Sequence, residues 1–423
     1  MKKSINKTAL TSVIIVLSLF VGSTMLFTAC TNGFGSNKTI VNGVEIPALI
    51  ARKGVLATAA EWTKTQEKVT ELTAKIVAQP TDIKPRLQLA TIFMSEARIT
   101  GDSYYNQATL KVLDGVLGIE PKNFEATTYR ASMAMSLHQF ETARSLATAA
   151  KAINPDNAYV YGVLVDANVE QGNYAEAIAM SDKMQVLKPS LESYARASYL
   201  REIYGDYPGA IDAMTLAVKA GLPGSESAAW SQTILADLYL NAGDLAKAKE
   251  NYDAVLAVRA NFPNAVIGQA KLAKAQGDYV TAIKRTEDAI KIASEASYIS
   301  LLGELYALSG DAAKATKINT DVVRLLEAAE KEQQSSEIVM AHNAKRELAM
   351  DYLAVKDYNK ALTFAKQDLA LRPNNIDANE LVAWVLYSKG DKAAAAPFAE
   401  KMLATGSKNP EKLNKARLIM AAR

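Results

Sequence analysis

The stretch "LADLYLNAGDLAKAKENYDAVL", residues 235–256, has the pattern of two short helices joined at a glycine. On both sides of Gly243, apolar and small residues recur three and four positions apart, as they do on one face of an α-helix. Gly243 fits the end of the first helix, because glycine adopts the left-handed conformation of a helix C-cap at little cost. The stretch therefore predicts a pair of antiparallel helices.

The same element recurs at a fixed interval along the chain. Six segments place Gly before Asp or Asn and an Ala five residues after the Gly, beginning at Gly172, Gly205, Gly243, Gly277, Gly310 and Gly390. His138 and Lys356 take the glycine position in two further copies. Pro121, Pro155 and Pro189 lie 34 residues apart, where each would stop the second helix of a unit. A period of this length predicts helix pairs that bury their apolar faces only by stacking.

Seven positions of the opening stretch carry a known motif: Leu235, Ala236, Tyr239, Gly243, Ala248, Tyr252 and Val255. The segments "LGELYALSGDAAKA" and "LVAWVLYSKGDKAAAA" repeat it. This pattern resembles the tetratricopeptide repeat (TPR) over roughly residues 83–406. The resemblance implies an all-α fold, a right-handed α-solenoid of stacked antiparallel helix pairs.

We predict a solenoid over residues 55–423, with about nine repeats. An extra helix over 55–79 precedes the first unit, 83–121, whose helix turn carries the insertion "RITGDSYYNQ". A capping helix is expected over 408–423. The interval of 46 residues between Ala315 and Ala361 contains no Gly or Pro over 322–348, which favours two lengthened helices over a linker.

The N-terminus has the pattern of a lipoprotein precursor. A basic segment, 1–8, precedes an uncharged apolar run, 9–27, and the single cysteine of the chain, Cys30, follows. "LFTAC" resembles the lipobox of bacterial lipoproteins, which implies a signal peptide over 1–29 and a lipidated Cys30. Residues 30–54, rich in Gly, Asn and Ser at their start, are interpreted as a flexible tether. The alternative is a plain signal anchor with an incidental cysteine.

Charge and cysteine content exclude several classes of function. Without residues 1–29 the chain has 45 basic side chains (48 less Lys2, Lys3 and Lys7) and 45 acidic ones, so its net charge is zero. That balance lacks the basic field of general nucleic-acid binding, and we predict no nucleic-acid partner. One cysteine rules out internal disulfides and thiolate metal clusters.

No catalytic motif is found, and we predict neither enzymatic activity nor a cofactor. The two histidines, His138 and His342, are 204 residues apart, the first in a predicted turn and the second near a helix start. A metal or acid–base pair is one interpretation of them, but we predict that neither is catalytic and that the chain has no metal site. No segment outside the repeats is large enough for a catalytic domain.

The preferred hypothesis is an outer-membrane lipoprotein, facing the periplasm, that binds a protein or peptide in its concave groove and helps to assemble an envelope machine. Thr31, rather than Asp, follows the lipidated cysteine, which favours the outer membrane. A glycan- or nutrient-binding helical-repeat lipoprotein is the alternative, weakened by short insertions between helices.

The resemblance to the tetratricopeptide repeat implies a groove on the first helices of repeats three to five. Its main residues are Tyr159, Asp166, Glu170, Tyr199, Trp230 and Asp237, and its additional residues are Val169, Glu192, Glu202 and Asn241. For Tyr199 and Trp230, simple gap-filling between helices remains open.

Overall fold

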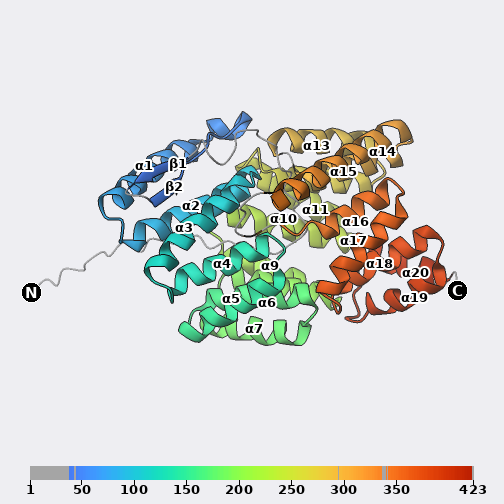
Figure 1. Cartoon of the computed structure of the whole chain (residues 1–423). Helices are drawn as coiled ribbons and strands as arrows, with labels where there is room; N and C mark the ends of the chain where they lie inside the picture. Colours follow the sequence, from blue (N-terminus) through green and yellow to red (C-terminus); the bar gives the residue numbers. More distant parts are fainter. Residues whose placement is uncertain (1–37, 42–43, 294, 336–339, 341, 422–423) are drawn as a thin grey trace, which may run out of the picture.

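The computed structural model describes residues 38–41, 44–293, 295–335, 340 and 342–421. Cys30, the apolar run and the predicted signal peptide lie outside these residues. Twenty α-helices follow one another within the described part, mostly as adjacent antiparallel pairs (Figure 1). The predicted all-α solenoid of stacked helix pairs is confirmed.

An N-terminal unit precedes the pairs: the hairpin of β1 (Lys38–Val41) and β2 (Val44–Pro47), the 3-10 helix η1 (Gly54–Thr58) and α1 (Ala60–Ala78). The first five pairs are α2 (Ile83–Thr100) with α3 (Tyr104–Ile119), α4 (Phe124–Ser136) with α5 (Phe140–Ile153), α6 (Ala158–Gln171) with α7 (Tyr174–Leu187), α8 (Leu191–Ile203) with α9 (Tyr207–Ala220), and α10 (Glu226–Asn241) with α11 (Leu245–Val258). The next four are α12 (Pro263–Ala275) with α13 (Tyr279–Ile292), α14 (Ala296–Leu308) with α15 (Ala312–Ser335), α16 (Lys345–Ala354) with α17 (Tyr358–Leu371), and α18 (Ile376–Lys389) with α19 (Lys392–Lys401). The last helix is α20 (Pro410–Met420).

The Gly-Asp dipeptide between paired helices has two separate tasks. Gly243 has φ 83°, the left-handed conformation that closes the first helix. The next residue, Asp244, accepts a hydrogen bond from the Lys247 amide and so caps the second helix. His138 and Lys356 adopt φ 56° and 64° at the same position, which confirms that they replace the glycine.

The alanine of the motif lies where the paired helices cross. Its eight copies are all buried, at 5% exposure or less: Ala143, Ala177, Ala210, Ala248, Ala282, Ala315, Ala361 and Ala395. A larger side chain there would force the two helices apart, which explains why the motif specifies alanine.

Two details differ from the predicted helices. The insertion in the first unit lengthens α2 and α3, so that only residues 101–103 remain between them. Between Ala315 and Ala361 only one helix is lengthened: α15 has 24 residues, whereas α16 has 10. Helix α16 starts late because Asn343 is held in a non-helical segment by its amide, which donates to the Leu137 carbonyl at 2.9 Å.

The predicted tether is also shorter than expected, because residues 44–52 pack against α2 and α3. Ile46 is buried in the core of this region. The Tyr104 and Tyr105 hydroxyls donate to the carbonyls of Ala48 and Ile50 at 2.7 and 2.9 Å. Arg52 is buried and forms two hydrogen bonds to the Glu96 carboxylate. These contacts hold residues 44–52 against the helices, although the polar start of the segment had predicted a flexible tether.

Successive turns of the superhelix touch each other, so the array is not open along its axis. Turns between paired helices contact chain segments about 200 residues later: Leu137 and His138 with Asn343, Val169 and Tyr174 with Asn375 and Ile376, and Ile203 with Thr405. The side-chain hydrogen bonds among these contacts join residues that are 205, 206, 202 and 202 positions apart in the sequence. These contacts bring the segments just before α16 and α18 against the C-terminal ends of α4 and α6.

Candidate functional site

The predicted groove positions on α6 are occupied by buried, paired carboxylates. Asp166 accepts two hydrogen bonds from the Arg196 guanidinium, at 2.9 and 2.6 Å. Glu170 accepts one from Arg372 at 2.7 Å, across to the next superhelical turn. The two acids are only 4% and 6% exposed. As a correction to the predicted groove, neither presents a free carboxylate to a partner, and both instead join helices.

The predicted aromatic residues are half-buried. The Tyr159 hydroxyl shares a hydrogen bond of 2.6 Å with the Ser132 hydroxyl. Tyr199 packs against a core cluster that includes Val165, and Trp230 packs against two clusters of its own region. Their contacts agree with the gap-filling alternative, while part of each side chain stays accessible to solvent.

Two carboxylates of the predicted groove, Glu202 and Asp237, lie near Asp377, which was not predicted, and we call these three residues the acidic row. They come from α8, α10 and α18. Burial raises the pKa of Glu202 to about 7, and the negative charges of Asp237 and Asp377 add to this, against the hydrogen bond from Asn241. Asp237 accepts from the Tyr252 hydroxyl at 2.6 Å. The Asp237 and Asp377 side chains keep 21% and 34% of their surface exposed, so solvent reaches this acidic surface.

A pocket of about 330 Å³ lies where two superhelical turns meet. It is bounded by the α4–α5 turn, α6, α14, α16 and α17. Five carboxylates and two guanidiniums line it: Glu170, Glu304, Glu347, Asp351 and Asp368, with Arg346 and Arg372. The lining charge is therefore negative, since the acids exceed the arginines by three.

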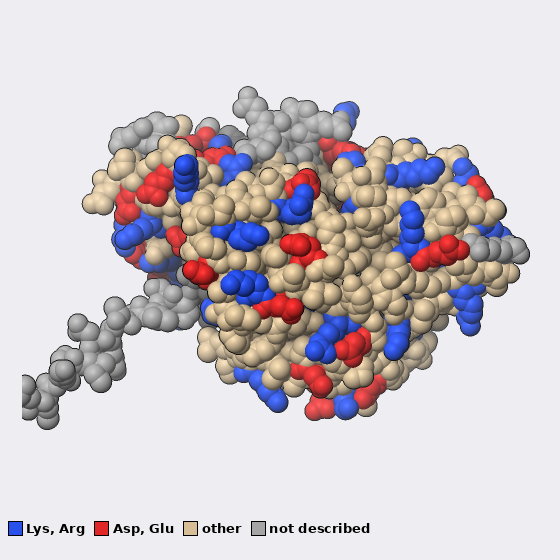
Figure 2. Space-filling model, turned by 90° about the horizontal axis from the view of Figure 1, so that it is seen from below, with Lys and Arg blue, Asp and Glu red and all other residues tan. Residues whose placement is uncertain are grey.

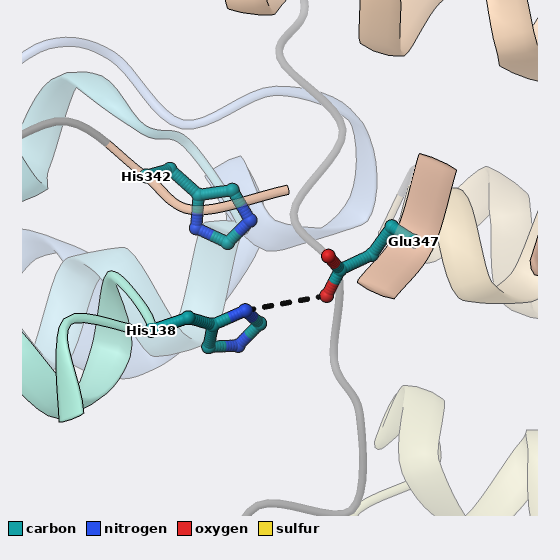
Figure 3. A group of neighbouring side chains, drawn as sticks. All are labelled: His138, His342 and Glu347. Atoms are coloured by element: carbon teal, nitrogen blue, oxygen red, sulfur yellow. Dashed lines mark ion pairs between the residues drawn. The ribbon is translucent and has the colours of Figure 1, made fainter. Parts of the chain in front are cut away.

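His138, His342 and Glu347 converge at one side of this pocket (Figure 3). His138 Nδ1 lies 3.3 Å from Glu347 Oε1, and the two imidazole rings are 4.6 Å apart between centroids. Burial lowers the pKa of His138 to about 3, helped by the positive charges of Arg346 and Arg372. Burial also lowers the pKa of His342 to about 4. Both imidazoles are therefore neutral at pH 7.

From the sequence, a metal pair was one interpretation of the two histidines, but their meeting with Glu347 was not predicted, because the histidines are 204 residues apart. Only the number of repeats in one superhelical turn brings them together, and no local pattern encodes that number. A weak signal existed: their separation of 204 residues matches the 202 to 206 residues that separate other contacting segments of adjacent turns.

Arg372 occupies the centre of the contact between the turns. Its Nε and Nη2 donate to Asp368 at 2.9 and 2.8 Å, and its Nη1 donates to Glu170. The guanidinium also lies over the Phe140 ring, 5.6 Å from its centroid. One buried cation thus pairs with two buried acids from different turns.

Asp351 gives the pocket a pH response. Burial raises its pKa to about 7, and the charge of Glu347 adds to this, while a hydrogen bond from the Ser300 hydroxyl at 2.8 Å opposes it. The folded state therefore binds this proton more tightly than the unfolded chain, whose Asp pKa is about 3.9. The resulting stability is fully present below about pH 4 and is lost as pH rises through about 7.

We expect Asp351→Asn to remove that loss. At pH 8 the variant should unfold with a free energy on the order of 2–4 kcal/mol higher than the unmodified chain, because no charge is buried. At pH 5 the difference should be much smaller. Chemical denaturation at both pH values measures it. An equal difference at pH 5 and pH 8 would contradict the assignment.

The face shown in Figure 2 carries Lys and Arg interspersed with Asp and Glu, without a continuous area of one sign. Among the described residues, no helix combines the length and apolar character that crossing a membrane requires.

The comparisons with known proteins agree with the fold. Residues 235–298 match the family model described as tetratricopeptide repeat, and no curated protein matches the chain. Among solved structures, a human IFIT1 dimer with PPP-AAAA has 13% identity and a TM-score of 0.50, covering 77% of this chain and 73% of that one. Pseudomonas aeruginosa pilF has 17% identity and a TM-score of 0.39 over 51% and 97% of the two chains. The APC/C hetero-tetramer Cut9-Hcn1 has 15% identity and a TM-score of 0.45 over 84% of this chain, which spans 58% of that one.

The class of protein follows from the nine helix pairs and the family match together. The chain folds as an α-solenoid of the tetratricopeptide type, a fold consistent with a scaffold that binds other proteins or peptides.

Proposed function

We propose that this protein is an outer-membrane lipoprotein, facing the periplasm, whose solenoid binds a protein or peptide partner and contributes to an envelope assembly. The observation that carries the binding part is the acidic row, which three different repeats form and in which Asp237 and Asp377 are partly exposed. Solenoids present extended surfaces of this kind to their partners. The half-buried Tyr199 and Trp230 come from the same helices, α8 and α10.

The charge of this surface selects the chemistry of the partner. Asp377 is paired with Lys412 at 2.6 Å, and Lys271 approaches Asp237 at 3.8 Å, so the row is only partly neutralised. A segment with basic and apolar side chains would add positive charge to this surface. Aromatic side chains beside them provide anchoring area of the kind that dominates many interfaces.

The double substitution Glu202→Gln with Asp237→Asn tests the binding surface. We expect loss of partner capture by the detergent-solubilised lipoprotein, with unchanged helicity, because the amides keep the shape and remove the charge. Glu250→Gln with Asp212→Asn is the matched control, since both acids are exposed on α11 and α9 of the same repeats. Capture that survives the first pair, or fails equally in both, would refute the acidic row as the binding surface.

The lipid anchor depends on Cys30. We expect Cys30→Ser to block lipidation and to leave either unprocessed precursor or protein released from the membrane, because only the thiolate can accept the diacylglyceryl group. Fractionation of inner membrane, outer membrane and soluble periplasm, with metabolic labelling by a fatty acid, measures this. A correctly processed Cys30→Ser protein that remains with the membranes would place the anchor elsewhere.

A further inference from the structure

We propose that His138, His342 and Glu347 form a binding site for a divalent transition-metal ion of the Zn²⁺ class, which clamps adjacent turns of the superhelix. One nitrogen of each imidazole and one carboxylate oxygen all lie within 4.8 Å of one another. Two histidines and a glutamate are an established ligand set for zinc, with a further position left for water or another ligand. The three residues come from the α4–α5 turn, the segment before α16, and α16 itself.

The distances are close to those of a bound ion. Ligands at about 2.0–2.1 Å from a tetrahedral ion are separated from one another by roughly 3.3–3.4 Å. His138 Nδ1 and Glu347 Oε1 already have this separation, at 3.3 Å. His342 would need to approach by at most about 1.5 Å, which a side chain at the end of a non-helical segment can do by rotation.

A second observation points to a missing ligand. Glu347 is only 6% exposed, and its Oε2 has no hydrogen-bond partner among the described residues. A buried carboxylate oxygen without a partner is costly, and a cation coordinated by both oxygens of Glu347 is one of the few ways to compensate it. Figure 3 shows that this carboxylate points toward the two imidazoles.

The surrounding charge is compatible with a cation. Arg346 and Arg372 line the same pocket and repel a positive ion, but five carboxylates line it too. Arg372 is occupied by Asp368 and Glu170. The pocket therefore keeps an excess of negative charge, and a divalent ion reduces it.

The position of the site gives the ion a structural consequence. His138 belongs to one superhelical turn and His342 and Glu347 to the next, where the existing links are hydrogen bonds between Asn343 and residues 137–138. A coordinated ion adds bonds across the same contact. Binding only to the folded chain would also make its unfolding temperature rise with the logarithm of the metal concentration, once that concentration exceeds the dissociation constant.

The test uses the purified full chain in detergent, without a histidine tag and with Cys30→Ser in all samples, so that no thiolate competes. Zn²⁺ is titrated against a chromophoric chelator, and Co²⁺ absorption reports the ligand geometry. We expect one equivalent of Zn²⁺ to bind per chain. In His342→Ala and in Glu347→Gln we expect the affinity for Zn²⁺ to be weaker by a factor of about ten or more. Because the chain has only two histidines, NMR signals of both imidazole rings should change with one equivalent of Zn²⁺.

Glu295→Gln is the matched control. Glu295 is likewise buried, with an unpartnered Oε2, but it lies outside the trio. The Glu295→Gln variant should bind Zn²⁺ as tightly as the parent does. Circular dichroism in the presence of a chelator shows whether each variant folds. If His342→Ala does not fold, the isosteric Glu347→Gln still provides the test. The proposal is overturned if the parent binds no stoichiometric metal, or if folded Glu347→Gln binds it as tightly as the parent, which would indicate a hydrogen-bonded polar cluster only.

Discussion

Arg372→Ala should lower the free energy of unfolding by about 3–5 kcal/mol, because it leaves buried carboxylates without their cation. Arg372 is 1% exposed and is the guanidinium that pairs with both Asp368 and Glu170. Water cannot replace it at either acid without opening the contact between the turns. Chemical denaturation of the variant, followed by circular dichroism, measures the loss.

Arg324→Ala provides the control for this loss. Arg324 also forms an ion pair, with Asp321 at 2.6 Å, but its side chain is 75% exposed. Exposed pairs contribute about 0–1 kcal/mol, so this variant should be nearly as stable as the parent. If both arginine variants lose the same small amount, the contact around Arg372 opens in solution and the two turns are not held together there.

Gly172→Ala should lower the free energy of unfolding by about 2–5 kcal/mol. Part of this, about 1 kcal/mol or more, is the cost of a left-handed conformation, since Gly172 has φ 78°. The rest comes from a steric clash. A Cβ there would lie 2.5 Å from the Asn374 carbonyl oxygen and the Asn375 amide nitrogen, which are backbone atoms of the next superhelical turn.

Gly243→Ala separates these two costs. Gly243 occupies the same motif position with φ 83°, but a Cβ there meets no described atom within 4 Å. This variant should therefore lose only about 1 kcal/mol, the conformational part. Equal losses in thermal or chemical unfolding of the two variants would mean that adjacent turns do not touch at Gly172.

These two comparisons also test how the solenoid unfolds. In a simple repeat array each unit contacts only its neighbours, so damage spreads locally. Here Gly172 meets Asn374, and Ile203 accepts from Thr405, so distant repeats share contacts. Damage at Gly172 should therefore loosen residues near 374 as well, which hydrogen exchange can detect.

The local structure was determined by the sequence itself. The Gly-Asp dipeptide specifies a left-handed C-cap followed by an N-cap, and Ala248 and its equivalents set the close helix crossing. These are interactions between residues a few positions apart or between neighbouring helices. A pattern that repeats every 34 residues or so is therefore enough to predict the fold, including the unusual φ of His138 and Lys356.

What the tertiary structure alone decided is where repeats of different turns meet. The small rotation from each helix pair to the next accumulates over about 200 residues, and no single repeat encodes its sum. This accumulated rotation pairs Glu170, which was predicted to line the groove, with Arg372 of another turn. It also brought His138 to His342 and Glu347 and packed Gly172, but not Gly243, against another turn. Such contacts depend on the geometry of the whole array, whereas the sequence motif records only the geometry of one unit.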